Sequence, residues 1–179
     1  EEARAYLALA RHYLTPAQPG LTAIGGLSGS GKSTKARAMA RGLGPAPGAV
    51  VLRSDQIRKA RFHRKETDRL PPEAYASEIS VAVYAEMMEK AAAALTEGFH
   101  AIADATFLHP DSRRLIEETA RQAAVPFHGI WLDVSRETAA ARIEQRVAEN
   151  ADASDADTQV LARQLRADLG QITWRRVKA

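Results

Sequence analysis

The residues from Gly26 to Thr34 carry the most specific chemical signal in the sequence, Gly-Leu-Ser-Gly-Ser-Gly-Lys-Ser-Thr. They match G-x-x-x-x-G-K-[ST], the pattern of a phosphate-binding loop. Glycines there let the backbone turn its N–H groups toward a phosphate, and the following helix adds its positive N-terminal end. We expect Lys32 to reach the β- and γ-phosphates of a nucleoside triphosphate and the Ser33 hydroxyl to bind Mg²⁺. The predicted nucleotide-binding residues are Gly26, Ser28, Gly29, Ser30, Gly31, Lys32, Ser33 and Thr34.

Asp55 is the strongest candidate for an acid–base residue. It follows an apolar segment at 49–52 and lies in the stretch Arg-Ser-Asp-Gln-Ile-Arg-Lys. A kinase needs a carboxylate beside the acceptor hydroxyl, to take its proton or to orient it for attack on the γ-phosphoryl group. Arg58 follows one helical turn later and could hold an anionic group of the substrate. The plainer interpretation makes Asp55 the N-cap of a helix that starts at Gln56, and both roles can hold together.

Asp104 and Thr106 close a later apolar segment, in the sequence Ala-Asp-Ala-Thr. An acid at the end of a strand is typical of the second acid of a phosphate-loop site, which holds Mg²⁺ directly or through water. We therefore predict metal binding by Ser33 and Asp104, with Thr106 helping to position the substrate or the γ-phosphate. An ordinary turn at the end of a strand is the alternative.

Arg142 and Arg146 are four residues apart, so they share one face of a predicted helix. An arginine from a closing lid can neutralise the charge on a transferred phosphoryl group. We expect one of the two to act in this way, and favour Arg146 because it lies nearer an aspartate-rich segment. In the alternative interpretation they form a solvated face with Glu144 and Glu149 as ion-pair partners.

A basic run follows Asp55 directly, and consists of Arg58, Lys59, Arg61, His63, Arg64 and Lys65. Such runs are usually solvated surface. Because this one adjoins the candidate base, an anionic substrate is a second interpretation. Phe62 is its single aromatic residue, which is little for a platform that stacks nucleic-acid bases.

Alternating strands and helices must position these residues. Apolar segments predict strands at 21–24, 49–52, 99–104 and 127–133, with a short last strand at 172–174. Helices are predicted at 2–14, 35–43, 73–97, 110–124, 135–149 and 159–169, with a polar, irregular stretch at 56–72 and an exposed loop or lid at 150–158. This alternation predicts an α/β fold whose parallel sheet is covered on both faces. Ligands of such sheets bind beyond the carboxyl ends of the strands, where Asp55, Asp104 and Asp133 would meet the phosphate loop.

Residues 1–19 and 20–179 are predicted to be separate units. The first is a helix with an apolar face followed by a Pro- and Gly-containing linker, and the second is the phosphate-loop domain. The core of the domain does not need the helix, and the sequence starts with Glu1 rather than Met. We therefore expect a fragment of a longer polypeptide, with the helix lying at a junction with an upstream domain.

The composition is that of an ordinary globular domain, with 179 residues, 45% hydrophobic and 26% charged. A net charge of +3 is too weak to imply a nucleic-acid partner by itself. The absence of cysteine excludes disulfides, thiolate metal sites and cysteine nucleophiles, and fits a reducing cytoplasm. No apolar run approaches the ~20 residues of a membrane span, so we expect a cytoplasmic protein without a membrane partner.

Taken together, five motifs resemble the AAA-type, zeta-toxin-like P-loop kinase domain. They are the loop at 26–34, the stretch at 52–59, Arg-Leu-Pro-Pro-Glu-Ala-Tyr at 69–75, Asp-Ala-Thr-Phe at 104–107 and Asp-Ala-Ser-Asp-Ala at 152–156. The resemblance covers about residues 20–170 and implies a P-loop NTPase fold, a three-layer sandwich with a parallel central sheet and a helical lid. The domain is often found at the C-terminus of bifunctional aminoglycoside phosphotransferase/ATP-binding proteins, which implies a fused N-terminal kinase-like domain. The aminoglycoside label belongs to that other domain.

More distantly, the layout is similar to the 5′-hydroxyl polynucleotide kinases. In those enzymes an Arg-x-Asp-x-x-Arg motif supplies the general base and a phosphate-binding arginine. The resemblance assigns the motif to Arg53, Asp55 and Arg58, the strand-end pair to Asp104 and Thr106, and the lid arginine to Arg142 or Arg146. It thereby implies substrate binding by Arg53, Arg58, Asp104 and Thr106.

The sequence thus predicts an ATP- and Mg²⁺-dependent kinase that phosphorylates a hydroxyl group, with Asp55 as general base and Lys32 and a lid arginine stabilising the transferred group. Two acceptors stay open, a small metabolite and the 5′-hydroxyl of a nucleic acid, as does GTP in place of ATP. A different class is a non-catalytic module that hydrolyses ATP to switch a partner domain, and it would not need Asp55 and Arg58. An oligomeric AAA motor is disfavoured, because 179 residues leave no room for its lid domain and sensor elements.

Overall fold

A single parallel sheet forms the centre of the molecule. The computed structural model describes residues 2–14, 18–44, 46–149 and 153–179. Within these residues five strands pair in the order β2-β3-β1-β4-β5. They are β1 (Leu21–Gly26), β2 (Val50–Arg53), β3 (Ala101–Asp104), β4 (Phe127–Asp133) and β5 (Arg175–Lys178). All pairings are parallel, which confirms the predicted α/β fold.

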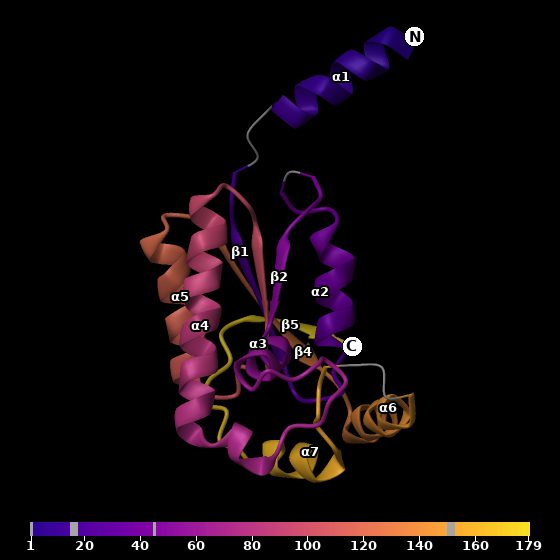
Figure 1. Ribbon diagram of the computed structural model, residues 1–179, viewed down its shortest axis with the longest axis vertical. Coiled ribbons are helices and arrows are strands. Elements are labelled where there is room, and N and C mark those ends of the chain that lie inside the picture. The colour runs from indigo at the N-terminus through magenta and orange to yellow at the C-terminus, as the bar shows by residue number, and fades with distance from the viewer. Residues whose placement is uncertain (1, 15–17, 45, 150–152) are drawn as a thin grey trace.

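Helices cover both faces of the sheet (Figure 1). The helices that follow β1 are α2 (Lys32–Ala40), α3 (Ser54–Arg61), the 3₁₀ helix η1 (Pro72–Tyr75), α4 (Ser77–Thr96), α5 (Pro110–Gln122), α6 (Arg136–Glu149) and α7 (Thr158–Gln164). On one face Met87 of α4 and Ile116 of α5 pack against the sheet, and on the other Ala36 of α2 packs against Ile24 and Ile102. β1 is buried along its whole length because both faces are covered.

The helices α6 and α7 pack on each other beyond the carboxyl ends of the strands. Ala139 and Ile143 of α6 and Leu161 of α7 form a small buried cluster, with Leu27 of the phosphate loop against it. We call α6, residues 153–157 and α7 the lid, and this apolar cluster holds it against the phosphate loop. Residues 153–157 lead into α7, and they are buried or partly buried instead of exposed as predicted, while 150–152 lie outside the described residues.

The helix α1 (Glu2–Leu14) stands apart from the three layers in Figure 1. Its predicted apolar face is open, with Tyr6 67% and Leu9 48% exposed. The described part of the chain contains no helix with the length and apolar character needed to cross a bilayer.

Among the predicted boundaries that were wrong are the start of α3 and the position of the last strand. The helix α3 begins at Ser54, immediately after β2, so its N-cap is Arg53, and Asp55 lies in the first turn instead of capping it. At the other end of the chain the last strand is 175–178 and not 172–174. Trp174 is instead buried, where its ring meets the rings of Phe107 and Phe127 edge-on or tilted.

Candidate active site

An open cleft of about 900 Å³ lies at the carboxyl ends of the strands, and most of the predicted site residues line it. These are Ser28, Gly29, Gly31, Lys32, Ser33, Thr34, Arg53, Asp55, Arg58, Asp104, Thr106, Arg142 and Arg146. Gly26 and Ser30 belong to the same loop but are buried, and they are not among the lining residues. The prediction that Asp133 joins this group was wrong, because both of its oxygens accept hydrogen bonds from Arg176 of β5, at 2.7 and 2.8 Å.

The phosphate loop has the backbone that its glycines predict. Gly29 and Gly31 have φ angles of 79° and 85°, in the left-handed region that favours glycine. A Cβ at Gly29 would also collide with the backbone of Ala139, so the loop lies directly against α6. A Cβ at Gly31 would lie 3.6 Å from Nη1 of Arg142, which places that guanidinium group over the loop.

Lys32 is the first residue of α2, three residues earlier than the predicted helix start. Its Nζ donates hydrogen bonds to the carbonyl oxygens of Gly26 at 3.0 Å and Leu27 at 2.8 Å. Burial lowers the pKa of Lys32, and the negative charges of Asp104 and Asp55 oppose this effect. The ammonium group thus lies between the loop and the two carboxylates.

Gln164, the last residue of α7, contacts the phosphate loop and was not predicted from the sequence. The Ser28 N–H donates to its Oε1 at 2.8 Å, and its Nε2 donates to the Ser28 hydroxyl at 3.0 Å. The oxygen and the nitrogen of the Gln164 amide therefore both form hydrogen bonds that connect α7 to the phosphate loop. No local pattern could have identified Gln164, because its partner lies 136 residues earlier in the chain.

Asp55 is half-buried in the first turn of α3. Burial, followed by the negative charge of Asp104, raises the pKa of Asp55. A hydrogen bond with the Ser154 side chain and the charge of Lys32 oppose this rise. A carboxylate with raised proton affinity, on the wall of a cleft, has the properties of a general base.

Asp55→Asn is expected to raise the melting temperature of the nucleotide-free protein near neutral pH. Because the pKa of Asp55 is raised on folding, its contribution to stability is complete below the ordinary Asp value of about 3.9 and is lost as the pH rises through the raised pKa. Asparagine has no charge to bury. Calorimetry from pH 4 to 8 should therefore show a difference that grows with pH, by roughly 2–4 °C for each kcal/mol gained. A variant that melts below the wild type at pH 8 would contradict this assignment.

Asp104 and Ser33 fit a magnesium ion. Asp104 ends β3, is 4% exposed, and has an Oδ2 that lies 3.3 Å from Nε of Arg53 without accepting a hydrogen bond from the described residues. The described chain has no group of three or more metal-ligating side chains. Mg²⁺ is usually held by one or two carboxylates together with substrate phosphates, so this donor set suits it.

The far wall of the cleft is built around Arg58. This side chain is 6% exposed, donates to the Ala74 carbonyl at 2.6 Å and to the Ser80 hydroxyl at 3.3 Å, and lies over the Tyr75 ring. Its Nε is buried and has no hydrogen-bond partner among the described residues. Arg58 is thus fixed in the wall, with one donor atom unused.

Thr106 lies on the same wall, beside a tyrosine that was not predicted from the sequence. Its hydroxyl is 3.4 Å from the Tyr84 hydroxyl, which also accepts a hydrogen bond from the Phe107 N–H at 3.1 Å. Burial raises the pKa of Tyr84, so it stays a neutral phenol. Thr106 and Tyr84 therefore present neutral hydroxyl groups to the cleft.

The basic run does not form one cationic surface. Lys59 and Arg58 are buried, and Arg61 forms an ion pair with Glu86 of α4 at 2.8 Å. Arg61 and the end of the run, at 63–65, are exposed. The start of the run is therefore part of the packing around α3, and the rest lies on the surface.

The two lid arginines differ in their surroundings. Arg146 is partly buried and its Nη2 donates to the Ala156 carbonyl at 2.6 Å, whereas Arg142 is exposed and lies over the loop at Gly31. Of the ion-pair partners that the plainer interpretation suggests, Glu144 is exposed, and the side chain of Glu149 lies outside the part of the chain that the structure describes. Arg146 is held by the lid, and Arg142 faces the phosphate loop.

A protein-family model described as "AAA domain" matches residues 21–167. Uncharacterized proteins of Mycobacterium tuberculosis and Mycobacterium bovis are 32% identical over 157 residues, which is 83% of this chain and 30% of theirs. The chain therefore spans less than a third of the length of these relatives.

Solved structures of kinases share the fold. A kinase described as putative from Chloroflexus aurantiacus has a TM-score of 0.66 at 20% identity, covering 92% of this chain and 86% of that one. The APS kinase of Mycobacterium tuberculosis, in complex with AMPPNP and APS, has a TM-score of 0.63 at 17% identity, covering 91% and 90%. A gluconokinase of Sinorhizobium meliloti has a TM-score of 0.59 at 20% identity, covering 90% and 83%.

Proposed function

Since the chain belongs to the AAA domain family, we propose that it is a kinase that transfers the γ-phosphoryl group of ATP to a hydroxyl group of a small acceptor. The observation that carries the proposal is that the phosphate loop, the strand-end acid Asp104 and a third group, Asp55, line one cleft. A module that only hydrolyses ATP needs the first two and not the third.

The donor side would hold the triphosphate on the N–H groups of the loop and the first turn of α2. The charges of both acids act on Lys32, whose Nζ would exchange the carbonyls of Gly26 and Leu27 for phosphate oxygens. Ser33 and Asp104 would hold Mg²⁺, which neutralises charge on the phosphates when it is bound. These groups stabilise the charge that develops on the transferred oxygens.

On the acceptor side, Asp55 would accept the proton of the hydroxyl as that oxygen attacks phosphorus. Its raised pKa favours the protonated product of that step. Arg58, with its unused Nε, and the neutral hydroxyl of Thr106 would orient the acceptor. We therefore propose Arg58 and Thr106 as substrate-binding residues, and Arg53 as the residue that holds Asp104 in place.

Arg142→Ala is expected to lower kcat for transfer by about 10²- to 10³-fold, a larger loss than Arg146→Ala causes. The contacts favour Arg142 as the arginine of the transferred phosphoryl group, in place of the Arg146 that the sequence favoured, because Arg146 is engaged with Ala156. Steady-state kinetics of the two variants, each with AMPPNP binding measured alongside, test this order. Equal losses, or a greater loss for Arg146→Ala, would contradict it.

The state of the basic run favours a small acceptor over a polynucleotide. With Arg58 and Lys59 buried and Arg61 paired with Glu86, the run offers a phosphodiester backbone fewer free cations than its sequence suggests. The 5′-hydroxyl of an oligonucleotide remains the second candidate. We further propose a cytoplasmic protein that acts beside a separate upstream domain, in line with the greater length of its relatives.

Transfer from γ-³²P-labelled ATP to a panel of acceptors tests these alternatives. The panel comprises gluconate, APS, the aminoglycoside kanamycin and a 5′-hydroxyl oligonucleotide, each assayed at 50 and 200 mM salt. We expect labelling of a small hydroxyl compound with little dependence on salt. Labelling of the oligonucleotide alone, with a steep loss at the higher salt concentration, would identify the second candidate.

A further inference from the structure

We propose that Asp155 is a positioning residue, which holds the lid segment 154–156 between Asp55 and Arg146 and so keeps the Asp55 carboxylate directed at the acceptor. The proposal rests on the proposed function, because it assigns Asp155 to the same phosphoryl transfer. It concerns a part of the Asp-Ala-Ser-Asp-Ala motif for which the sequence provided no role.

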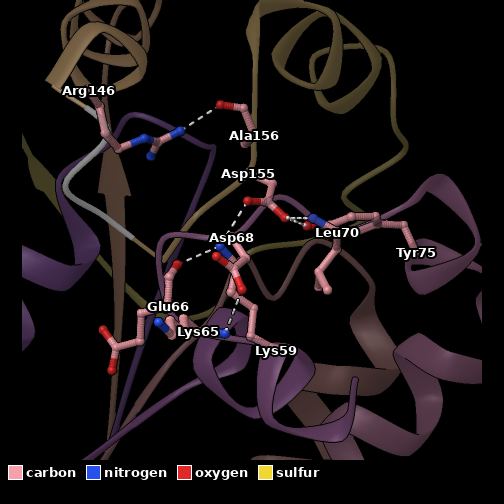
Figure 2. Close-up of polar contacts among 9 residues, drawn as sticks. All are labelled: Lys59, Lys65, Glu66, Asp68, Leu70, Tyr75, Arg146, Asp155 and Ala156. Carbon is pink, nitrogen blue, oxygen red and sulfur yellow. Dashed lines mark hydrogen bonds and ion pairs between the residues drawn. The ribbon is translucent and has the colours of Figure 1, made fainter. Parts of the chain in front are cut away.

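The Asp155 carboxylate contacts α3, the loop at Leu70 and the 3₁₀ helix η1, which all lie at least 80 residues earlier in the sequence (Figure 2). Its Oδ1 lies 2.9 Å from Nζ of Lys59 in α3. Its Oδ2 accepts hydrogen bonds from the Leu70 N–H at 3.0 Å and from the Tyr75 hydroxyl at 2.7 Å. Both oxygens of one carboxylate are therefore used, and the lid is fastened to the loop and 3₁₀ helix that follow α3.

The three consecutive residues of the lid segment, 154–156, each contact a different partner. Ser154 forms a side-chain hydrogen bond with Asp55, and its neighbour Asp155 binds Lys59, one helical turn further along α3. The next residue, Ala156, accepts from Arg146 of α6. Three consecutive residues thus connect the candidate base with a lid arginine, and a displacement at Asp155 would reach both.

Burial makes this anchor specific. The Lys59 side chain is 2% exposed and that of Asp155 is 11% exposed, and Nζ of Lys59 also donates to the Glu66 carbonyl at 2.5 Å. A buried ion pair adds little net stability, because both charges must be removed from water. Its main effect is to specify which residues lie against each other. Because Ser154 occupies part of the Asp55 carboxylate, the segment also determines which of its lone pairs the acceptor can reach.

The test compares Asp155→Asn with Asp157→Asn, which removes the same charge two residues away. Asp157 is the N-cap of α7 and accepts from the Val160 N–H at 2.9 Å, a role that asparagine fills equally well. With the acceptor that the wild type labels fastest in the panel above, we expect Asp155→Asn to lower kcat by about 10²-fold. The affinity for AMPPNP should stay within about twofold in both variants, and Asp157→Asn should keep the wild-type kcat.

A merely structural role would instead change AMPPNP affinity and kcat together, and so would overturn the proposal. A kcat for Asp155→Asn equal to that of the wild type would also overturn it. If Asp155→Asn fails to fold because Lys59 has lost its counter-ion, the Tyr75→Phe variant tests the proposal instead. It removes one hydrogen bond to Asp155 and no charge, and it should lower kcat by about 3- to 10-fold at unchanged AMPPNP affinity. An unchanged kcat there contradicts the proposal, whereas a wild type that labels no acceptor contradicts the proposed function itself.

Discussion

Replacing Asp55 with alanine is expected to reduce phosphoryl transfer by about 10²- to 10⁴-fold and to leave nucleotide binding within about twofold. The reason is geometric, since Asp55 lies in the first turn of α3 and lines the same cleft as the phosphate loop. Its carboxylate can meet the acceptor hydroxyl, while the triphosphate is held by other groups. Single-turnover transfer measures the first effect, and titration with AMPPNP measures the second.

Asp133→Ala provides the matched control for this experiment. Asp133 is also an acid at the end of a strand, but it pairs with Arg176 and is not among the residues that line the cleft. The control should transfer phosphate at the wild-type rate. Unchanged transfer by Asp55→Ala would refute its assignment as the general base, whatever the result for Asp133→Ala.

Lys32→Ala is expected to remove both transfer and tight nucleotide binding. Its ammonium group is the cation inside the phosphate loop, so its loss leaves the β- and γ-phosphates without a counter-charge both before and during transfer. We expect AMPPNP affinity to fall at least about tenfold and kcat at least about 10³-fold. Calorimetric titration and single-turnover transfer give the two values separately.

Lys35→Ala is the control for charge and helix content, because Lys35 is exposed on the same helix, one turn from Lys32. It should bind AMPPNP and transfer phosphate as the wild type does. A Lys32→Ala variant with normal turnover would contradict the assignment of residues 26–34 to the triphosphate.

The parts of the site that could be predicted are those built from neighbouring residues. The loop from Gly26 to Thr34 contains its own glycines, lysine and helix start, so its nine residues suffice to define it. Asp55 and Asp104 follow apolar segments whose parallel pairing brings their ends together, and Arg53 pairs in register with Asp104. The parallel sheet and the helices on both of its faces follow from the alternation of strands and helices, whereas the strand order comes from the structure.

The rest depends on contacts between distant residues. Asp133 and Asp55 both follow apolar segments, so their local sequence predicts that both belong to the site. Only the structure shows that Asp133 instead pairs with Arg176 of β5. The last strand was misplaced because the sequence shows an apolar Ile-Thr-Trp, whereas the structure buries Trp174 against aromatic rings from other segments. Asp155 and Gln164 have polar partners 80 or more residues away, and no periodicity within one segment reveals them.

The basic run illustrates how burial reverses an interpretation of charge. Six cationic or titratable residues within eight positions suggest a solvated surface or an anion site. The structure instead directs Lys59 inward to Asp155 and Arg58 into the wall of the cleft. One turn of helix separates Asp55 from Lys59, so the same helix that carries the candidate base also receives the lid.

The central claim is that this cleft transfers phosphate to a hydroxyl group and does not merely hydrolyse ATP. It is tested most directly by the partition of the labelled γ-phosphate between acceptor and inorganic phosphate, measured in one reaction for the wild type and for Asp55→Ala. We predict that the wild type places most of the label on an acceptor hydroxyl and that Asp55→Ala loses this product while still binding AMPPNP. Label found only in inorganic phosphate, at the same slow rate in both proteins, would contradict the account.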